Sequence, residues 1–274
     1  MIRKGYTDGP FGQAHWRMAE PEEGGRAAPD LYCFHPAPFS GLAYTGIMPQ
    51  LAAARRVIAP DYPGYGGSDA FTLTPSINDY AKAMASVIET LSGDAPVDLL
   101  GFHTGCLVAA QCAIDDPALV RRLVLIDVPA FDDETSRKLA ASNGEPPALT
   151  PELSCLSKPW ESGVVKRLES QSMARAFEMF VEQLRPGAAM NAAFHAAFSY
   201  PWTERLPLVR HETMVLATKS SLLEGSRKAA SLTPNAVLKE RLDITRAVLD
   251  EAADKTAAEV ERYLSREKGG EHDG

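Results

Sequence analysis

Short apolar runs alternate with stretches of helical periodicity along most of the chain. The apolar runs occupy residues 31–36, 56–61, 97–102, 123–128 and 213–218, each flanked by turn residues. Continuous apolar runs are typical of strands that are buried on both faces. Helical patterns at 46–54, 77–93 and 105–117 separate the first four runs. This alternation predicts a parallel α/β sheet.

The two ends of the chain carry weaker patterns. Residues 12–21 are expected to supply a strand of an N-terminal hairpin, and residues 236–244 a last strand. Residues 250–266 have the pattern of a closing amphipathic helix, and the polar tail at 267–274 is expected to fray. The helix that begins near residue 105 should end near Asp116, because Pro117 disfavours helical geometry in the residue before it.

The alternation stops between residues 131 and 210. This block is helical in pattern and rich in large apolar side chains, and no strand-like run interrupts it. The simplest interpretation is a helical cap inserted between two strands. We therefore predict a core made of residues 1–130 and 211–274, with residues 131–210 as the cap.

Composition and charge narrow the classes of partner. Of the 274 residues, 45% are hydrophobic and 23% are charged, which is ordinary for a globular protein. The formal net charge of −8 argues against nucleic acid and against anionic membrane surfaces. No apolar stretch approaches the length of a membrane span, and the basic start lacks the apolar core of a signal peptide.

The four cysteines lie in apolar or helical contexts without the spacing of metal ligands. They are Cys33, Cys106, Cys112 and Cys155. Buried thiols in a reducing compartment are the favoured interpretation, so we expect a cytoplasmic protein.

The stretch "LLGFHTGCLVA" holds the main candidate for chemistry. A strand-like run ends at Gly101, His103 stands in the middle of a Gly-x-His-x-Gly pattern, and a helical run begins after Gly105. This arrangement predicts a sharp strand-to-helix turn. Side chains are absent at the two glycines, as close packing of the strand against the helix would require.

Four motifs together resemble the α/β-hydrolase superfamily. They are "FHPAP" at 34–38, "DYPGYGGSD" at 61–69, "GFHTG" at 101–105 and "RRLVLIDVPA" at 121–130. The resemblance implies a mostly parallel sheet flanked by helices, with an inserted helical cap. "GFHTG" stands where this superfamily has Gly-x-Ser-x-Gly, so the chain is similar to a divergent member with histidine at the nucleophile position.

The other positions of the family's catalytic triad also differ. The segment that follows residue 218 usually carries an aspartate, but here it reads "KSSLLEG". The segment after the last strand usually carries the catalytic histidine, but here it reads "LDITRAV", with Thr245 or Arg246 near that slot. An ordinary serine-hydrolase mechanism is therefore not expected.

His103 is the predicted catalytic residue. The elbow of this family aims its middle side chain into the pocket, where a neutral imidazole can act as nucleophile or as general base. The alternative is an inactive elbow whose histidine only fills space. Asp127, at the end of the next strand, could orient the imidazole, or it could simply cap the following turn.

The resemblance also suggests the oxyanion donors and a supporting residue. The backbone amides of Ala37 and Thr104 are the candidates, because the prolines on either side of Ala37 have no N–H. His35 is expected to brace this loop beside the substrate. A metal site of His35, His103 and Asp127 is conceivable from the residue types, but the spacing does not support it.

Further residues are candidates for contact with substrate. Arg246 could keep His103 neutral or hold a substrate carboxylate, although a solvated arginine at a helix start is the favoured interpretation. Trp160, Phe194 and His195 of the predicted cap could line the pocket, although aromatics at helical spacing more often belong to a core. These side chains favour an apolar or aromatic small-molecule substrate.

The prediction is therefore a cofactor-free enzyme. Neither a dinucleotide-binding glycine fingerprint nor a phosphate-binding loop occurs in the sequence. Hydrolysis of an ester, thioester, lactone or related carbonyl compound is the first expectation. A lyase or isomerase that uses His103 as general base, and a non-catalytic ligand-binding protein, remain open. The apolar cap is also a candidate surface for a homodimer.

Overall fold

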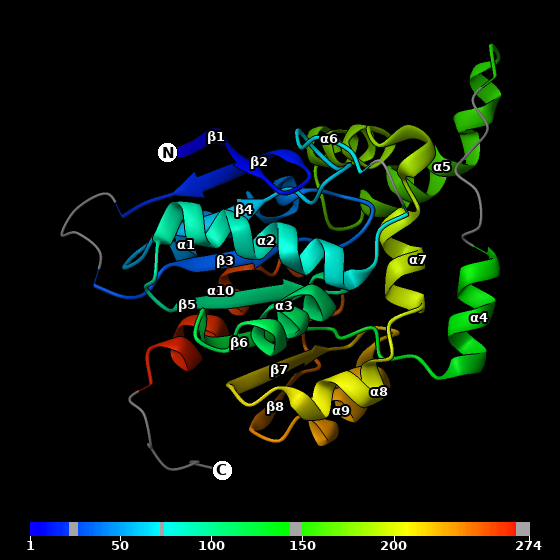
Figure 1. The fold of residues 1–274 in the computed structure, drawn as a ribbon. Coiled ribbons are helices and arrows are strands. Elements are labelled where there is room, and N and C mark those ends of the chain that lie inside the picture. The colour runs from blue at the N-terminus through cyan, green and yellow to red at the C-terminus, as the bar shows by residue number, and fades with distance from the viewer. Residues whose placement is uncertain (22–26, 72–73, 143–149, 267–274) are drawn as a thin grey trace.

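A computed structural model describes residues 1–21, 27–71, 74–142 and 150–266. The described strands form an eight-stranded sheet in the order β1-β2-β4-β3-β5-β6-β7-β8 (Figure 1). The strands are β1 (Ile2–Gly9), β2 (Gly12–Ala19), β3 (Leu31–Phe34), β4 (Val57–Pro60), β5 (Val97–Phe102), β6 (Val120–Ile126), β7 (Glu212–Thr218) and β8 (Ala236–Arg241).

Helices connect and cover these strands. The α-helices are α1 (Met48–Leu51), α2 (Ile77–Ser92), α3 (Thr104–Asp115), α4 (Asp133–Ser142), α5 (Ser157–Gly163), α6 (Met173–Leu184), α7 (Ala192–Phe198), α8 (Trp202–Arg205), α9 (Leu223–Leu232) and α10 (Ala253–Leu264). Short 3-10 turns are η1 (Gly41–Tyr44), η2 (Leu153–Leu156), η3 (Val165–Arg167), η4 (Gly187–Ala189) and η5 (Leu206–Leu208). Among the described helices, none combines the length and the apolar character needed to cross a bilayer.

The sheet is mostly parallel, as the sequence predicts. β1 and β2 form an antiparallel hairpin whose second strand pairs antiparallel with β4. From β4 across to β8 all neighbours are parallel. Every residue of β3 and β4 is buried, which explains why these strands are continuous apolar runs.

Helices cover both faces of the sheet (Figure 1). α2, α3 and α9 contribute buried side chains to one core cluster, while α1 and α10 contribute to the cluster on the opposite face. Burial of apolar side chains on both faces supplies the main driving force for this arrangement.

The structure also corrects some predicted boundaries. The helix expected at 46–54 is shorter, since α1 spans only Met48–Leu51 and follows the 3-10 turn η1. Pro49 lies in the first turn of α1, the helical position that tolerates proline. α3 ends at Asp115, in agreement with the effect predicted for Pro117. The predicted frayed tail lies outside the described residues.

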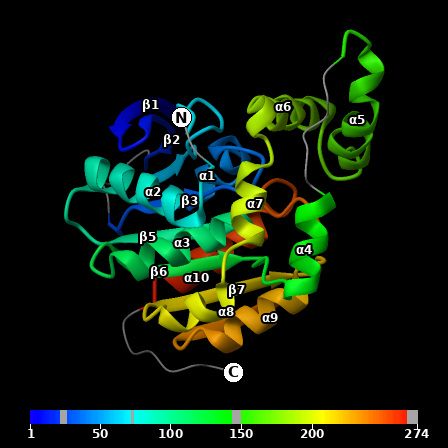
Figure 2. The ribbon, with the colours of Figure 1, turned by 45° about the vertical axis from the view of Figure 1, so that its right-hand side comes forward.

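The chain between β6 and β7 forms α4 to α8 (Figure 2). The helices α4 to α7 lie beyond the carboxyl ends of the parallel strands (Figure 1). α6 buries Ala176, Met179, Phe180 and Glu182, whereas α4 buries none of its residues. The division into a core and a cap at residues 131–210 stays a prediction.

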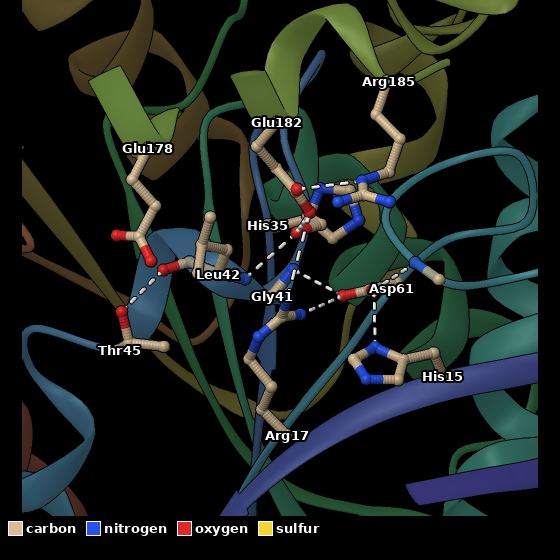
Figure 3. Close-up of polar contacts among 12 residues, drawn as sticks. His15, Arg17, His35, Gly41, Leu42, Thr45, Asp61, Glu178, Glu182 and Arg185 are labelled. Atoms are coloured by element: carbon tan, nitrogen blue, oxygen red, sulfur yellow. Dashed lines mark hydrogen bonds and ion pairs between the residues drawn. The ribbon is translucent and has the colours of Figure 1, made fainter. Parts of the chain in front are cut away.

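A buried carboxylate joins several parts of the core (Figure 3). Asp61, directly after β4, is fully buried and faces His15 Nδ1 at 2.7 Å and Arg17 Nη1 at 2.9 Å. Its two oxygens also accept hydrogen bonds from the backbone N–H groups of Gly41 and Gly67. Burial by itself would raise the pKa of Asp61, but the His15 hydrogen bond and the Arg17 charge hold that pKa below its ordinary value.

The same cluster reaches helix α6 (Figure 3). The hydroxyl of Ser40 donates a hydrogen bond to the buried carboxylate of Glu182. Arg17 Nη2 lies 3.9 Å from that carboxylate, and Arg185 Nε pairs with it at 3.1 Å. The buried charges therefore fix α6 relative to strand β2 and the loop after β3.

Two glycines allow β5 and α3 to pack closely at the turn between them. A Cβ atom at Gly105 would lie 1.9 Å from the carbonyl oxygen of Phe34, and one at Gly101 would lie 2.4 Å from the oxygen of Gly105. The obstructing atoms belong to the backbone, so neither contact can be relieved by a side-chain rotation. The glycines predicted for this turn are thus required by its packing.

We predict that Gly105→Ala lowers the free energy of unfolding by about 3 kcal/mol or more, because the β3 backbone must move to admit the methyl group. Gly9→Ala is the control. A Cβ at Gly9 would lie 3.4 Å from its nearest neighbour, which is an ordinary contact, and Gly9 does not have a positive φ, so a change within about 0.5 kcal/mol is expected. Urea unfolding followed by circular dichroism measures both values. Equal losses in the two variants would contradict the packing argument.

Candidate active site

His103 occupies the turn between β5 and α3 in a strained backbone conformation. Its φ of 51° and ψ of −119° are rare for a residue with a side chain. Its N–H donates to the carbonyl of Ile126 at 3.1 Å, and its carbonyl accepts from Cys106 N at 2.8 Å. The half-buried imidazole packs against Phe102, with 4.0 Å between the ring centroids. The fold therefore presents this side chain at the carboxyl edge of the sheet.

The imidazole faces a cavity of about 260 Å³. The loop after β3 supplies Ala37 and Phe39 to its wall, and the ends of β6 and β7 supply Asp127 and Thr218. The other walls come from the helical segment between β6 and β7 and from residues 245–250, which follow β8. Segments that are far apart in the sequence meet here because the carboxyl ends of parallel strands lie at one edge.

Among the predicted site residues, His103, Asp127, Ala37 and Arg246 line this cavity. Thr104 follows His103 directly and begins α3. As the first residue of the helix, its backbone N–H has no acceptor four residues earlier within α3. The elbow amide and the helix N-terminus both favour negative charge at this position.

Asp127 is buried and is also held at a positive φ, of 50°. Its Oδ1 accepts a hydrogen bond from Thr218 N at 2.8 Å, and its Oδ2 accepts one from Thr218 Oγ1 at 2.6 Å. No side-chain hydrogen bond joins it to His103 within the described residues. Asp127 therefore acts on the imidazole through its charge.

The imidazole of His103 is neutral at pH 7. Burial lowers its pKa to about 4, and the nearby negative charge of Asp127 only partly offsets this effect. A neutral imidazole has a free lone pair, so it can act as nucleophile or accept a proton.

His35 supports the neighbouring loop and does not line the cavity. Its ring is fully buried, with Nε2 accepting from Tyr62 N at 3.0 Å and Nδ1 lying 3.1 Å from the Pro36 carbonyl. Burial lowers its pKa to about 4. Both ring nitrogens are thus engaged with the backbone, so the structure does not bring His35 to the substrate position.

The structure also leaves Trp160, Phe194 and His195 outside the His103 cavity. Trp160 packs edge-on against Phe180, with 5.3 Å between the ring centroids. Phe194 stacks on Phe198, and His195 borders other hollows beside α7. Helical periodicity indicates which residues share a face, but it does not show which face turns toward the site.

Arg246 lines the cavity with about half of its side chain exposed. Its guanidinium donates a hydrogen bond to Glu169 and lies 3.8 Å from Glu251. Two carboxylates therefore already neutralise this cation, and its predicted role stays a prediction.

Sequence reasoning missed most of the wall, and Thr218, Arg167 and Met179 are the examples that matter for the chemistry. Thr218 ends β7 beside β6, and the adjacency of these two strands is the signal that could have found it. Arg167 and Met179 come from η3 and α6. Neither residue belongs to a recognisable sequence motif, and only the packing of their helical segments against the core brings them to the cavity. Within the described ranges, no group of three or more His, Cys, Asp or Glu side chains could hold a metal ion.

Comparison with known proteins identifies relatives of the chain. A family model described as "Alpha/beta hydrolase family" matches residues 31–264. The chain is 30% identical over 186 residues to 2-hydroxy-6-oxo-2,4-heptadienoate hydrolase from Pseudomonas putida, which covers 62% of this chain and 63% of the relative. It is 31% identical over 100 residues to pimeloyl-[acyl-carrier protein] methyl ester esterase from Aeromonas hydrophila, covering 36% of this chain and 37% of that protein. The chain thus matches less than two thirds of the length of each relative.

Solved structures share the fold over nearly the whole chain. A hydrolase from Pseudomonas aeruginosa PA01 superposes with a TM-score of 0.78 at 16% identity, covering 96% of this chain and 99% of that one. An enol-lactonase from Burkholderia xenovorans LB400 superposes with a TM-score of 0.77 at 18% identity, covering 96% of this chain and all of that one. At this identity the likeness shows the fold alone.

We predict that Asp127→Asn lowers the pKa of His103 further, because it removes the negative charge that favours the imidazolium. At pH 4 the wild-type ring should be about half protonated, since its pKa is about 4, and the ring of the variant should stay mostly neutral. NMR of ¹⁵N-labelled histidine side chains measures this, with the signal assigned from His103→Gln. Asp94→Asn, at an exposed carboxylate, is the control and should leave the titration unchanged. A wild-type pKa near 6.5 would contradict the effect of burial.

Proposed function

The chain belongs to the alpha/beta hydrolase family, and from that premise we propose a cofactor-free enzyme of hydrolase type. Its substrate would be a small apolar or aromatic ester, thioester, lactone or related carbonyl compound. The observation that carries this proposal is the neutral imidazole of His103, held at the elbow against a cavity of about 260 Å³. Relatives named hydrolase and methyl ester esterase support an enzyme of this class.

The proposed reaction begins with attack of the His103 imidazole on the substrate carbonyl carbon. The carbonyl electron pair moves onto oxygen, and the amides of Ala37 and Thr104 stabilise this oxyanion. When the oxyanion collapses, the bond to the alkoxide, thiolate or enolate leaving group breaks and an acyl-imidazole remains. Water then adds its hydroxyl to the acyl carbon, and the bond between that carbon and the His103 nitrogen breaks, with its electron pair returning to the ring. The carboxylic acid and the neutral imidazole are released, and the remaining proton of the water neutralises the leaving group. The charge of Asp127 favours the cationic acyl-imidazolium.

A second candidate is a lyase or isomerase in which His103 acts only as a general base. Both oxygens of Asp127 accept hydrogen bonds from Thr218, and among the described residues no carboxylate is hydrogen-bonded to the imidazole as in a catalytic triad. Proton abstraction beside a carbonyl needs the neutral ring and the oxyanion donors, but no covalent intermediate. A ligand-binding protein without catalysis is the remaining outcome.

The proposal extends to the compartment and the assembly. All four cysteines are free thiols, which supports a reducing compartment such as the cytoplasm.

A homodimer through α6 is also proposed. Met173, Phe177 and Val181, spaced at four residues, are 50%, 49% and 44% exposed and form an apolar stripe on that helix.

We predict that His103→Ala lowers turnover of p-nitrophenyl and thioester substrates by about 10²–10⁴-fold, because the reacting nitrogen is lost. Intact mass spectrometry of the wild type should detect an acyl adduct that the variant lacks. His211→Ala is the control, since this partly buried histidine contacts the Pro117 carbonyl and does not line the cavity. Loss of turnover without any adduct would favour the base mechanism. Unchanged turnover in His103→Ala would refute a catalytic role for this residue.

We predict that Phe177→Glu converts a dimer to a monomer, because a carboxylate in the centre of the apolar stripe would be buried without a partner. Size-exclusion chromatography with light scattering measures the mass. Lys158→Glu, at an exposed position of α5, is the control and should leave the mass unchanged. A monomeric wild type would contradict the proposed dimer.

A further inference from the structure

Besides Arg246, the wall of the His103 cavity contains a second cationic side chain, and this one forms no ion pair within the described residues. Arg167, the last residue of η3, lines the cavity on the side of the inserted helices. Within the described part of the chain, its guanidinium makes neither an ion pair nor a hydrogen bond. Its central carbon lies over the ring of Phe39, 5.1 Å from the ring centroid. Phe39 also lines the cavity, in the loop that follows β3.

The other charged groups of the cavity wall already have partners. The guanidinium of Arg246 is paired with Glu169, as described above. Asp250 accepts hydrogen bonds from Arg175 Nε at 3.0 Å and from Gln171 Nε2 at 2.6 Å. Asp127 is bound at both oxygens by Thr218. Of the two arginines that line the cavity, Arg167 is thus the one without an ion pair in the part of the chain that the structure describes.

The surroundings of Arg167 favour an anion. Burial lowers the pKa of its guanidinium, and the charge of Asp250 only partly opposes this because Arg175 acts in the opposite direction. The interaction energy between a cation and an anionic partner is larger when the cation is partly desolvated than when the cation is exposed to water. The cation–π contact with the Phe39 ring uses none of the N–H donors of Arg167, so the guanidinium can still bind a carboxylate through two of them.

We propose that the substrate carries a carboxylate and that Arg167 binds it in the cavity while the reacting carbonyl lies beside His103. The negative charge of Asp127, which acts on the His103 imidazole, disfavours the carboxylate at that position. Attraction to Arg167 and repulsion from Asp127 together set one orientation. This inference rests on the proposed function, because it names the substrate class of the same site.

Two esters of equal chain length test the inference. Mono-p-nitrophenyl glutarate has a carboxylate where p-nitrophenyl valerate has a methyl group. The wild type should have the higher kcat/KM for the glutarate ester. Arg167→Met should reduce that value about 10- to 100-fold, mainly through KM, because a hydrogen bond between charged groups is lost. The same variant should leave kcat/KM for the valerate ester within about twofold, since the neutral ester has no group for the guanidinium to bind.

Lys166→Met is the matched control, because it removes one positive charge from the same turn at an exposed position outside the cavity. Both esters should react as in the wild type. Arg246→Gln tests the competing cation. If that variant abolishes the preference for the glutarate ester and Arg167→Met does not, the inference is overturned.

A binding measurement separates this inference from the proposed reaction. In the His103→Ala background, calorimetry should detect binding of succinate, glutarate or adipate, and the added Arg167→Met change should abolish it. If dicarboxylate binding depends on Arg167 but the wild type hydrolyses neither ester, the proposed reaction is refuted and the proposed anion site is supported. The opposite outcome is hydrolysis of both esters at equal rates that Arg167→Met does not change, together with no dicarboxylate binding. This outcome would refute the proposed anion site and would leave the proposed hydrolysis supported.

Discussion

The close contact between the elbow and strand β3 is the constraint on which the site depends. A Cβ at Gly105 would lie 1.9 Å from the Phe34 carbonyl oxygen, so the helix can approach the strand only because no side chain is there. This approach places His103 at a φ of 51° at the carboxyl edge of the sheet. A strained conformation of this kind persists only where the surrounding packing determines it. The position of the imidazole is therefore a consequence of backbone packing.

A buried ionic cluster positions the other side of the cavity. Asp61 binds two basic side chains and two backbone amides, and Glu182 extends the same cluster to α6. Isolated buried charges are costly, but removal of one partner from a satisfied cluster costs more. The cluster therefore favours one placement of α6, the helix that contributes Met179 to the cavity wall. The close backbone packing at the elbow positions His103, and the ionic contacts of the Asp61 cluster position α6.

The chemistry follows from how charge is distributed around the imidazole. Burial keeps His103 neutral, while Asp127 lies near enough to favour a positive charge when one develops. Thr218 binds both oxygens of Asp127 and so fixes the orientation of the carboxylate, and no hydrogen bond joins this carboxylate to the ring within the described residues. Arg167 lines the same cavity and forms no ion pair within the described residues. The wall therefore carries both a negative and a positive side chain, and these two charges can orient a charged substrate.

The sequence by itself determined the parallel sheet, the elbow and its two glycines, because continuous apolar runs, helical periodicity and close glycine spacing are local signals. It also placed His103, Asp127 and Ala37 near one edge, since strand ends can be located along the chain. Tertiary structure alone decided which side chains complete the cavity. Arg167 and Met179 belong to inserted helices whose docking depends on distant contacts such as Ser40 with Glu182. Trp160 and Phe194 have the same local pattern, yet they pack against other aromatic rings, because periodicity defines a helix face and not its neighbour.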